Sequence, residues 1–200
     1  MAGAKEVEIK FRIEDRPALE KALKRAGFRV LTPRTYEDNQ LYDFPGGVLR
    51  GRGELLRLRR YGDQWKLTHK NRGSEGRHKS RQETETAVED GEAVAAIFGR
   101  LGLAPSFRYE KHRIEYGDGT GHVVLDETPL GDFGEIEGPP RWIDRTARAL
   151  GVQRDQYITA SYAQMFFDWK QRTGSPAEQM TFRECGRRTK SPPRARRTQR

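Results

Sequence analysis

The chain has 200 residues, enough for one domain with a buried core, and its single cysteine, Cys185, excludes an internal disulfide bond and a cysteine-based zinc cluster. Hydrophobic and charged residues each make up 34% of the sequence, so the apolar core must be thin or must share the interior with polar groups. The formal net charge is +9, but residues 171–200 contain nine Lys or Arg and two Glu, which accounts for +7 of it. Outside this stretch the charge is nearly balanced, which argues against a nucleic-acid-binding domain.

Residues 5–13 are the first predicted strand, and their charges fall at alternate positions: Glu6, Glu8 and Lys10. Apolar residues lie between them. Because side chains alternate between the two faces of a strand, one face is ionic and the other is apolar. The same arrangement recurs in six further segments, so it is a property of the whole fold.

A helix follows the first strand, because Asp15 can cap it, its apolar residues have helical spacing, and Gly27 ends it. The later elements are predicted in the same way from the spacing of apolar and polar residues. We expect an extended segment at 28–43, strands at 54–60, 65–70, 81–85, 109–115, 123–126 and 133–137, and helices at 91–101, 140–150 and 159–169. The sum is eight strands and four helices, an α+β pattern.

The ionic faces of these strands carry equal numbers of cations and acids. The cations are Lys10, Arg57, Arg59, Lys66, Lys70, Arg81, Lys111 and Arg113, and the acids are Glu6, Glu8, Glu83, Glu85, Glu115, Asp126, Glu135 and Glu137. An eight-stranded barrel has an interior wide enough for side chains or one small ligand. Buried charge is tolerated only when it is paired, hydrated or bound to a ligand. The pattern therefore favours a closed barrel that binds a polyanion together with divalent metal ions.

The opening motif, Glu6-Val7-Glu8-Ile9-Lys10, resembles the Glu-x-Glu-x-Lys signature of the CYTH family, also called triphosphate tunnel metalloenzymes. That signature is short, and the order of the motifs after it makes the resemblance specific. They are Leu56-Arg57-Leu58-Arg59, Leu67-Thr68-His69-Lys70, Arg81-Gln82-Glu83-Thr84-Glu85, Lys111-His112-Arg113, Leu125-Asp126-Glu127 and Gly131-Asp132-Phe133-Gly134-Glu135-Ile136-Glu137. The resemblance implies an α+β fold whose eight-stranded antiparallel β-barrel, flanked by helices, forms a triphosphate tunnel.

The resemblance also implies roles for individual residues. The residues expected to bind Mg²⁺ or Mn²⁺, which prefer oxygen ligands, are Glu6, Glu8, Glu83, Asp126, Glu135 and Glu137. The residues expected to bind phosphate oxygens are Lys10, Arg57, Arg59, Lys70, Lys111 and Arg113. Those with an expected catalytic role are Glu8, Lys10 and Lys70.

Each motif taken alone has a simpler interpretation. A single Glu-x-Glu pair is more often a solvated strand edge, and Arg57 with Arg59 would also suit a surface stripe for nucleic acid. Glu85 and Glu115 are interpreted as structural ion-pair partners. The four histidines have no spacing typical of zinc ligands. The number and order of the motifs favour one binding site over these separate interpretations.

Two reactions suit such a tunnel. If water attacks the terminal phosphorus, the protein is a triphosphatase; if a ribose 3′-hydroxyl attacks the α-phosphorus of ATP, it is a class IV adenylate cyclase. We favour the triphosphatase, with the cyclase as the alternative and a noncatalytic binder of polyphosphate or RNA ends third. Candidate substrates are tripolyphosphate, thiamine triphosphate and ATP. No Lys directly follows Ser161, as it does in some thiamine triphosphatases, which counts against thiamine triphosphate.

We expect a tunnel domain at residues 1–170 and a basic, disordered tail at 171–200, because the latter is rich in Pro, Ser, Thr and Arg. Neither a signal peptide nor a transmembrane segment is indicated, so a cytoplasmic protein without a membrane partner is expected. Nucleic acid is not an expected partner, except through the basic tail. The sequence makes no prediction of the oligomeric state.

Overall fold

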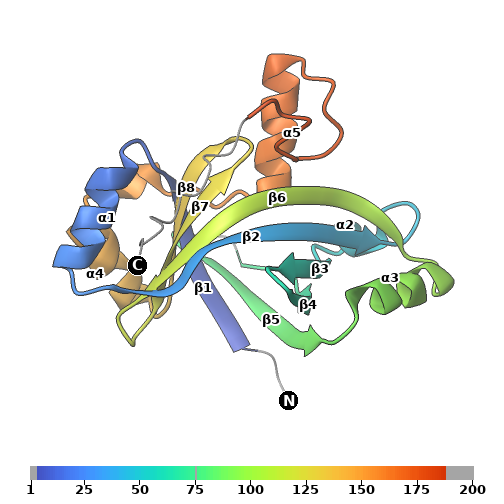
Figure 1. The fold of residues 1–200 in the computed structure, drawn as a ribbon, viewed down its shortest axis with the longest axis horizontal. Helices are drawn as coiled ribbons and strands as arrows, with labels where there is room; N and C mark the ends of the chain where they lie inside the picture. Colours follow the sequence, from blue (N-terminus) through green and yellow to red (C-terminus); the bar gives the residue numbers. More distant parts are fainter. Residues whose placement is uncertain (1–3, 75, 188–200) are drawn as a thin grey trace, which may run out of the picture.

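The protein is described here by a computed structural model, in which residues 4–74 and 76–187 are placed (Figure 1). Eight antiparallel strands close into a barrel in the order β1-β5-β4-β3-β2-β6-β7-β8. The strands are β1 Ala4–Arg12, β2 Arg29–Asp43, β3 Leu55–Tyr61, β4 Gln64–Lys70, β5 Lys79–Val88, β6 Ala104–Gly117, β7 His122–Thr128 and β8 Gly131–Glu137. The predicted fold class is confirmed.

Five α-helices lie around the barrel in the described residues, one more than the sequence predicted: α1 Arg16–Arg25, α2 Val48–Gly51, α3 Gly91–Arg100, α4 Pro140–Ala149 and α5 Tyr162–Thr173. The additional helix, α2, is a four-residue turn that follows Gly47, whose φ of 75° suits glycine. The helix predicted at 159–169 begins later, because Ser161 caps it by accepting a bond from the Gln164 amide at 3.2 Å. It ends at Gly174, which adopts the left-handed conformation.

The helices cover the apolar outer face of the barrel and leave the inner face to polar residues. Helices α1 and α4 lie together at one end (Figure 1) and share a core cluster with β1 that includes Leu23, Ile143 and Ile9. Helix α3 packs Phe98 against β2 and β3 in a second cluster. Helix α5 packs Phe166 against β6 and β8 in a third. This division agrees with the alternation of polar and apolar residues in the sequence, because successive side chains of a strand point inward and outward in turn.

Close packing of β1 against β8 depends on a glycine. Phe11 on β1 is paired with Gly134 on β8. A Cβ atom at position 134 would lie 2.2 Å from the Phe11 ring, so no other residue fits without displacing it. Two of the three strands that carry a Glu-x-Glu motif are thereby held in one register, with Glu8 opposite Glu137.

Residues 171–187 differ from the expectation of a disordered tail. Met180 is fully buried, and its amide and carbonyl groups bond to the Arg108 carbonyl and the Glu110 amide of β6 at 3.0 Å each. Arg187 forms an ion pair of 2.7 Å with Asp132 in the β7–β8 hairpin. Ala177 and Met180 are buried, and Phe182 packs on His112 with ring centroids 5.5 Å apart. These few apolar residues in a polar segment were too small a signal to outweigh the overall composition. Residues 188–200 of the predicted tail lie outside the described residues.

Candidate active site

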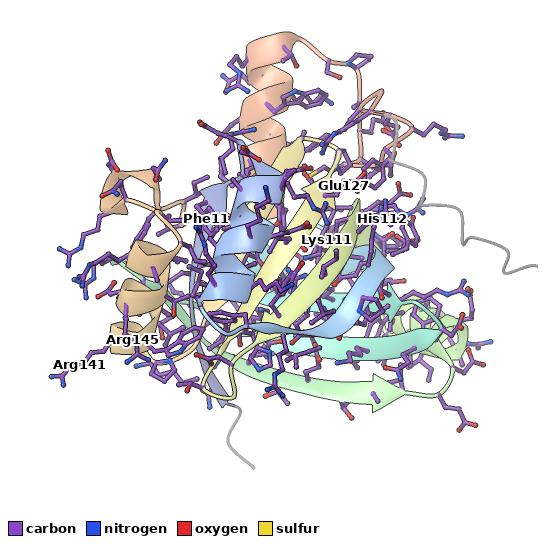
Figure 2. The ribbon with its side chains drawn as sticks, turned by 60° about the vertical axis from the view of Figure 1, so that its left-hand side comes forward. Phe11, Lys111, His112, Glu127, Arg141 and Arg145 are labelled. Carbon is purple, nitrogen blue, oxygen red and sulfur yellow. The ribbon has the colours of Figure 1, made fainter. Side chains whose placement is uncertain are left out.

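The interior of the barrel contains a cavity of about 700 Å³. Every strand contributes side chains to its wall, and every residue predicted for the site lines it except Asp126, which lies buried behind the lining at 1% exposure. On β6, Lys111 lines the cavity, whereas the neighbouring residue His112 and its partner on β7, Glu127, do not (Figure 2). The predicted ionic faces therefore do face inward.

One part of the wall, here named the inner cluster, consists of Lys10, Lys111, Arg113, Asp126 and Glu135. Asp126 accepts hydrogen bonds from Lys111 Nζ at 2.9 Å and Arg113 Nε at 2.7 Å. Glu135 lies 2.6 Å from Lys10 Nζ. Burial by itself would raise the pKa of Glu135, but the charges of Lys10 and Arg113 outweigh it and hold that pKa well below its usual range. The inner cluster is a fully paired ionic network.

Glu37 on β2 completes this part of the wall, although the sequence analysis did not select it. Its side chain is fully buried, and its carboxylate oxygens lie 3.5 Å from Arg59, 3.5 Å from Lys111 and 3.6 Å from Arg113. Burial disfavours the charged carboxylate, but these cations lower the pKa of Glu37 to about 2. Glu37 is therefore a buried anion that links cations of β3 and β6.

A second part of the wall, here named the outer carboxylates, consists of Glu6, Glu8, Glu83 and Glu137. Lys70 Nζ lies 2.7 Å from both Glu6 and Glu83. Lys79 lies 3.5 Å from Glu8. Arg57 Nη2 lies 4.0 Å from Glu83. Three cations thus face four carboxylates, so negative charge is in excess here.

The excess negative charge also affects Glu137, at the end of β8. Partial desolvation, together with the charges of Glu6 and Glu8, raises the pKa of Glu137 to about 7. Part of this shift is therefore repulsion between neighbouring carboxylates. A bound cation would relieve this repulsion.

The third part of the wall, formed by β3, β4 and β5, presents guanidinium groups around one carboxylate. Glu85 accepts bonds from Arg59 Nη2 at 3.0 Å, Lys66 Nζ at 3.1 Å and Thr68 Oγ1 at 2.8 Å. Arg57 lies 3.5 Å from Glu85 and donates to the Tyr109 hydroxyl at 3.3 Å. The interpretation of Glu85 as an ion-pair partner agrees with this geometry, in which its partners are Arg57, Arg59 and Lys66.

The cavity is therefore lined by the cationic faces of β3, β4 and β6 and by the outer carboxylates, where negative charge is in excess. The sequence model of the CYTH domain matches residues 4–162. The chain belongs to the CYTH domain family. A protein of Methanocaldococcus jannaschii, MJ0240, which is provisionally named an adenylate cyclase, is 28% identical over 171 residues, covering 80% of this chain and 97% of that protein.

Solved structures share the fold of this CYTH protein. One from Vibrio parahaemolyticus has a TM-score of 0.73 at 21% identity and covers 82% of this chain and 99% of its own. PH1819 of Pyrococcus horikoshii gives a TM-score of 0.69 at 24% identity, with coverages of 82% and 99%. HpAC1 of Hippeastrum, described as having a dominant triphosphatase activity, gives 0.63 at 20% identity, with coverages of 82% and 96%.

The donor set of the CYTH tunnel suits a hard divalent cation at the outer carboxylates. All four are oxygen donors, and their excess charge is the kind of environment that a cation neutralises. Among residues 4–74 and 76–187, no three Asp, Glu, His or Cys side chains are arranged as a ready ligand group. Lys70 stands between Glu6 and Glu83 in this state. Asp126 and Glu135, also predicted to bind metal, have lysine and arginine as partners instead.

Besides Glu37, the sequence analysis did not select Asn39, Lys79 or Tyr162 as site residues. Lys79 and Tyr162 line the cavity, whereas Asn39 is buried next to it and donates to Glu37 at 3.4 Å. Tyr162 has the spacing of an ordinary apolar residue of a helix, and Lys79 follows a polar loop. The loop residues Arg77 and His78 contact Asp144 on α4 at 2.7 and 2.9 Å.

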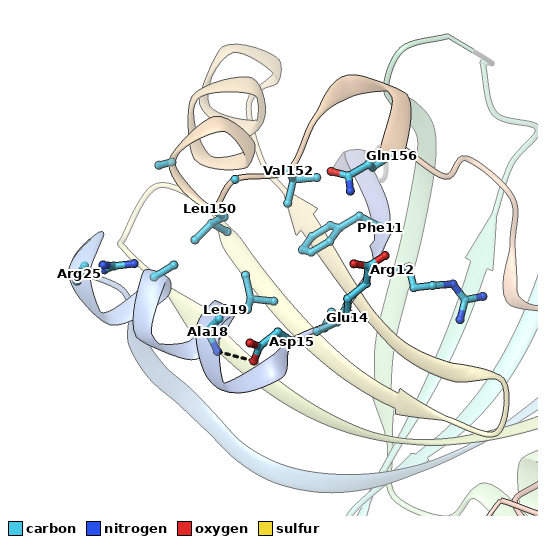
Figure 3. A pocket seen from close by; sticks show the side chains of 14 residues that line it. Phe11, Arg12, Glu14, Asp15, Ala18, Leu19, Arg25, Leu150, Val152 and Gln156 are labelled. Carbon is cyan, nitrogen blue, oxygen red and sulfur yellow. Dashed lines mark hydrogen bonds between the residues drawn. The ribbon is translucent and has the colours of Figure 1, made fainter.

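A second cavity of about 380 Å³ lies between α1 and the turn after α4 (Figure 3). Its floor consists of apolar side chains such as Leu19, Leu150 and Val152. Asp15 at its edge is occupied as the cap of α1, accepting from the Ala18 amide at 3.0 Å. This cavity lacks the converging cations that a polyphosphate needs. Arg141 and Arg145 on α4 project away from the barrel (Figure 2). No helix in the described part of the chain is both long and apolar enough to cross a lipid bilayer.

Proposed function

We propose that this CYTH protein is a metal-dependent triphosphatase that hydrolyses a triphosphate held in the barrel. The observation that carries the proposal is that two sets of charges line one cavity. Cations from β1, β3, β4 and β6 and the outer carboxylates all line it, and Lys70 of β4 joins the two sets between Glu6 and Glu83. Phosphoryl transfer requires charge neutralisation and in-line positioning, and these two sets supply both.

In this proposal the cations of the wall hold the phosphate oxygens. Arg57 and Arg59 offer planar guanidinium groups that suit two oxygens at once, and Lys10, Lys70, Lys111 and Arg113 add single or paired contacts. Each of these cations is already oriented by a carboxylate. When a triphosphate binds, its oxygens replace the carboxylates as partners of the cations. Water then forms a bond to the terminal phosphorus, the bridging P–O bond breaks, and phosphate and diphosphate result.

The metal, Mg²⁺ or Mn²⁺, would be held by the outer carboxylates Glu6, Glu8, Glu83 and Glu137. When bound, it supplies charge neutralisation and lowers the pKa of a coordinated water. Asp126 and Glu135 are proposed to orient Lys10, Lys111 and Arg113 before the substrate binds. Glu8 retains its proposed catalytic role, together with Lys10 and Lys70.

The aromatic residues of the cavity favour hydrolysis of a compact triphosphate. Its lining contains Tyr61, Tyr109 and Tyr162, and each of these rings already has a cation or another ring as a partner. The Arg59 guanidinium lies 5.7 Å from the Tyr61 ring, and Tyr109 stacks with Phe107 at 6.0 Å. Lysines cover Tyr162. Tripolyphosphate needs no stacking platform, so we propose it as the first substrate.

Class IV adenylate cyclase is the second candidate, because MJ0240, which is 28% identical over most of this chain, is provisionally named an adenylate cyclase. The purified full chain is incubated with Mg²⁺ or Mn²⁺ and, separately, tripolyphosphate, thiamine triphosphate and ATP, with EDTA as the control. We expect phosphate from tripolyphosphate and no cyclic AMP. Cyclic AMP with stoichiometric pyrophosphate would replace the proposal by the cyclase, and binding without any product would leave a noncatalytic binder. A cytoplasmic location remains a prediction.

A further inference from the structure

Tyr162 is the first residue of α5, yet its side chain belongs to the cavity. The helix lies outside the barrel, and its first turn, Ser161 to Ala163, contributes to the cavity lining. The ring is 7% exposed and is held by Tyr109 and Phe133, with ring centroids 5.9 and 6.0 Å away. Its orientation is therefore fixed by the core cluster beneath α5.

Two ammonium groups of the inner cluster lie on this ring. Lys10 Nζ is 4.5 Å and Lys111 Nζ 5.1 Å from its centroid. The negative face of an aromatic ring attracts cations, and the attraction is largest where water is excluded. Both lysines are buried, at 4% and 2% exposure, so water does not replace the ring as a partner.

The hydroxyl group of the same residue reaches the acid of the inner cluster. Tyr162 Oη donates a hydrogen bond of 2.8 Å to Asp126 Oδ2, the oxygen that also accepts from Lys111. One side chain therefore touches Lys10, Lys111 and Asp126 at once. A tyrosine that only filled the core would contact apolar groups with its ring and would not contact two cations and their counter-ion.

We propose that Tyr162 is a positioning residue, through which α5 sets the spacing of Lys10 and Lys111 for phosphate oxygens. The inference rests on the proposed function, because it assigns those lysines to a bound triphosphate. When the phosphate displaces Asp126 and Glu135 as partners of the lysines, the ring remains beneath both ammonium groups. The hydroxyl group meanwhile satisfies the oxygen of Asp126 that Lys111 leaves.

The test compares Tyr162→Phe, which removes only the hydroxyl group, with Tyr162→Leu, which removes the ring as well. Tyr116→Phe is the control, because Tyr116 is buried in a different core cluster, the one beside α1 and α4. Thermal unfolding of each variant checks that it is folded. Should Tyr162→Leu fail to fold, Tyr162→Phe and the wild type still decide the inference.

The first measurement does not depend on activity. In protein labelled with ¹³C-lysine, ring currents shift the ε-methylene protons of Lys10 and Lys111 upfield, and Lys→Arg variants assign the two signals. We expect the shifts in the wild type and in Tyr162→Phe, and their loss in Tyr162→Leu. Ordinary shifts in the wild type would overturn the placement of the lysines on the ring.

The second measurement is the affinity for tripolyphosphate, by calorimetry with and without Mg²⁺. Loss of the hydroxyl group leaves Asp126 to compete more strongly for Lys111, so Tyr162→Phe is expected to bind about tenfold more weakly. Tyr162→Leu is expected to bind tripolyphosphate about tenfold more weakly than Tyr162→Phe. Tyr116→Phe should match the wild type.

The two proposals fail in different ways. Wild-type affinity in both folded Tyr162 variants would overturn the positioning role while leaving the triphosphatase intact. A wild type that binds tripolyphosphate but releases no phosphate would overturn the hydrolase, and the affinity differences would still support the positioning role. A wild type that does not bind tripolyphosphate would overturn both.

Discussion

Glu135 and Glu137 lie two residues apart on β8 and both line the cavity, yet their environments are opposite. Glu135 contacts Lys10 and Arg113, and its pKa lies well below the usual range. Glu137 lies among other carboxylates, and its pKa is raised to about 7. The Glu-x-Glu motif therefore places two carboxylates on one face of a strand, but the neighbouring strands decide what each one does.

The difference separates a structural role from a binding role within a single motif. In the inner cluster each charge has an opposite partner, so removing one carboxylate leaves buried cations without a counter-ion. Among the outer carboxylates removing one reduces repulsion. The comparison predicts opposite effects of the same substitution at adjacent inward positions.

The largest expected effect is on stability. Glu135→Gln should lower the free energy of unfolding by about 3–5 kcal/mol, because Lys10 and Arg113 lose a buried partner. Glu137→Gln should leave it unchanged or raise it. Urea unfolding of both variants at pH 7.5 measures the difference, and equal losses would contradict the division between the two regions.

The next effect concerns the metal. Glu8→Gln should lower triphosphatase turnover in Mg²⁺ about 100-fold, because one oxygen ligand is weakened. Glu14→Gln is a suitable control, since Glu14 lines only the apolar cavity beside α1. Steady-state rates over a series of Mg²⁺ concentrations test this, and full turnover in Glu8→Gln would remove the outer carboxylates from the metal site.

A smaller effect is expected from the cations of β3. Arg57→Ala should raise the KM for tripolyphosphate about tenfold, because a charge-assisted contact to phosphate is lost. Arg60→Ala is the matched control on the same strand, since Arg60 is exposed and does not line the cavity. If the two variants have the same KM and kcat as the wild type, Arg57 does not bind the substrate.

The smallest effect is a pH dependence of stability. Between the ordinary carboxyl pKa of 4.5 and about 7, the folded protein retains a proton on Glu137 that the unfolded chain releases. Its contribution to the free energy of unfolding therefore falls as pH rises through this range. Because Glu137 is exposed, solvent reduces the size of the effect. Unfolding of wild type and Glu137→Gln at pH 5 and 8 should give curves that diverge toward high pH, and parallel curves would contradict the shift.

The barrel and most of its lining were predictable, because alternation within short strands specifies which face is ionic. Glu37 and Asn39 were not, since every position from Glu37 to Gln40 is polar, although the pairing with β6 is regular there. Polarity therefore did not distinguish the inward from the outward side chains of this segment.

Two other features depend on contacts between elements that are distant in the sequence. Tyr162 has the spacing of a core residue on a helix, and only the position of α5 over the barrel brings it to Lys10 and Lys111. The pairing of Met180 with β6 joins segments about 70 residues apart, which no local pattern reports. Local signals specify faces, and tertiary packing decides which faces meet.

Closure of the barrel also constrains how the protein folds during synthesis. β1 pairs with β5 on one side and with β8 on the other. β1 is synthesised first, and both of its edges can be paired only after the chain has been synthesised as far as Glu137, the end of β8. Contacts between residues so far apart in sequence form slowly, because a long loop must close first. Until β8 emerges, the ionic face of β1 keeps its charges in water, which helps the nascent strand to avoid pairing with other chains.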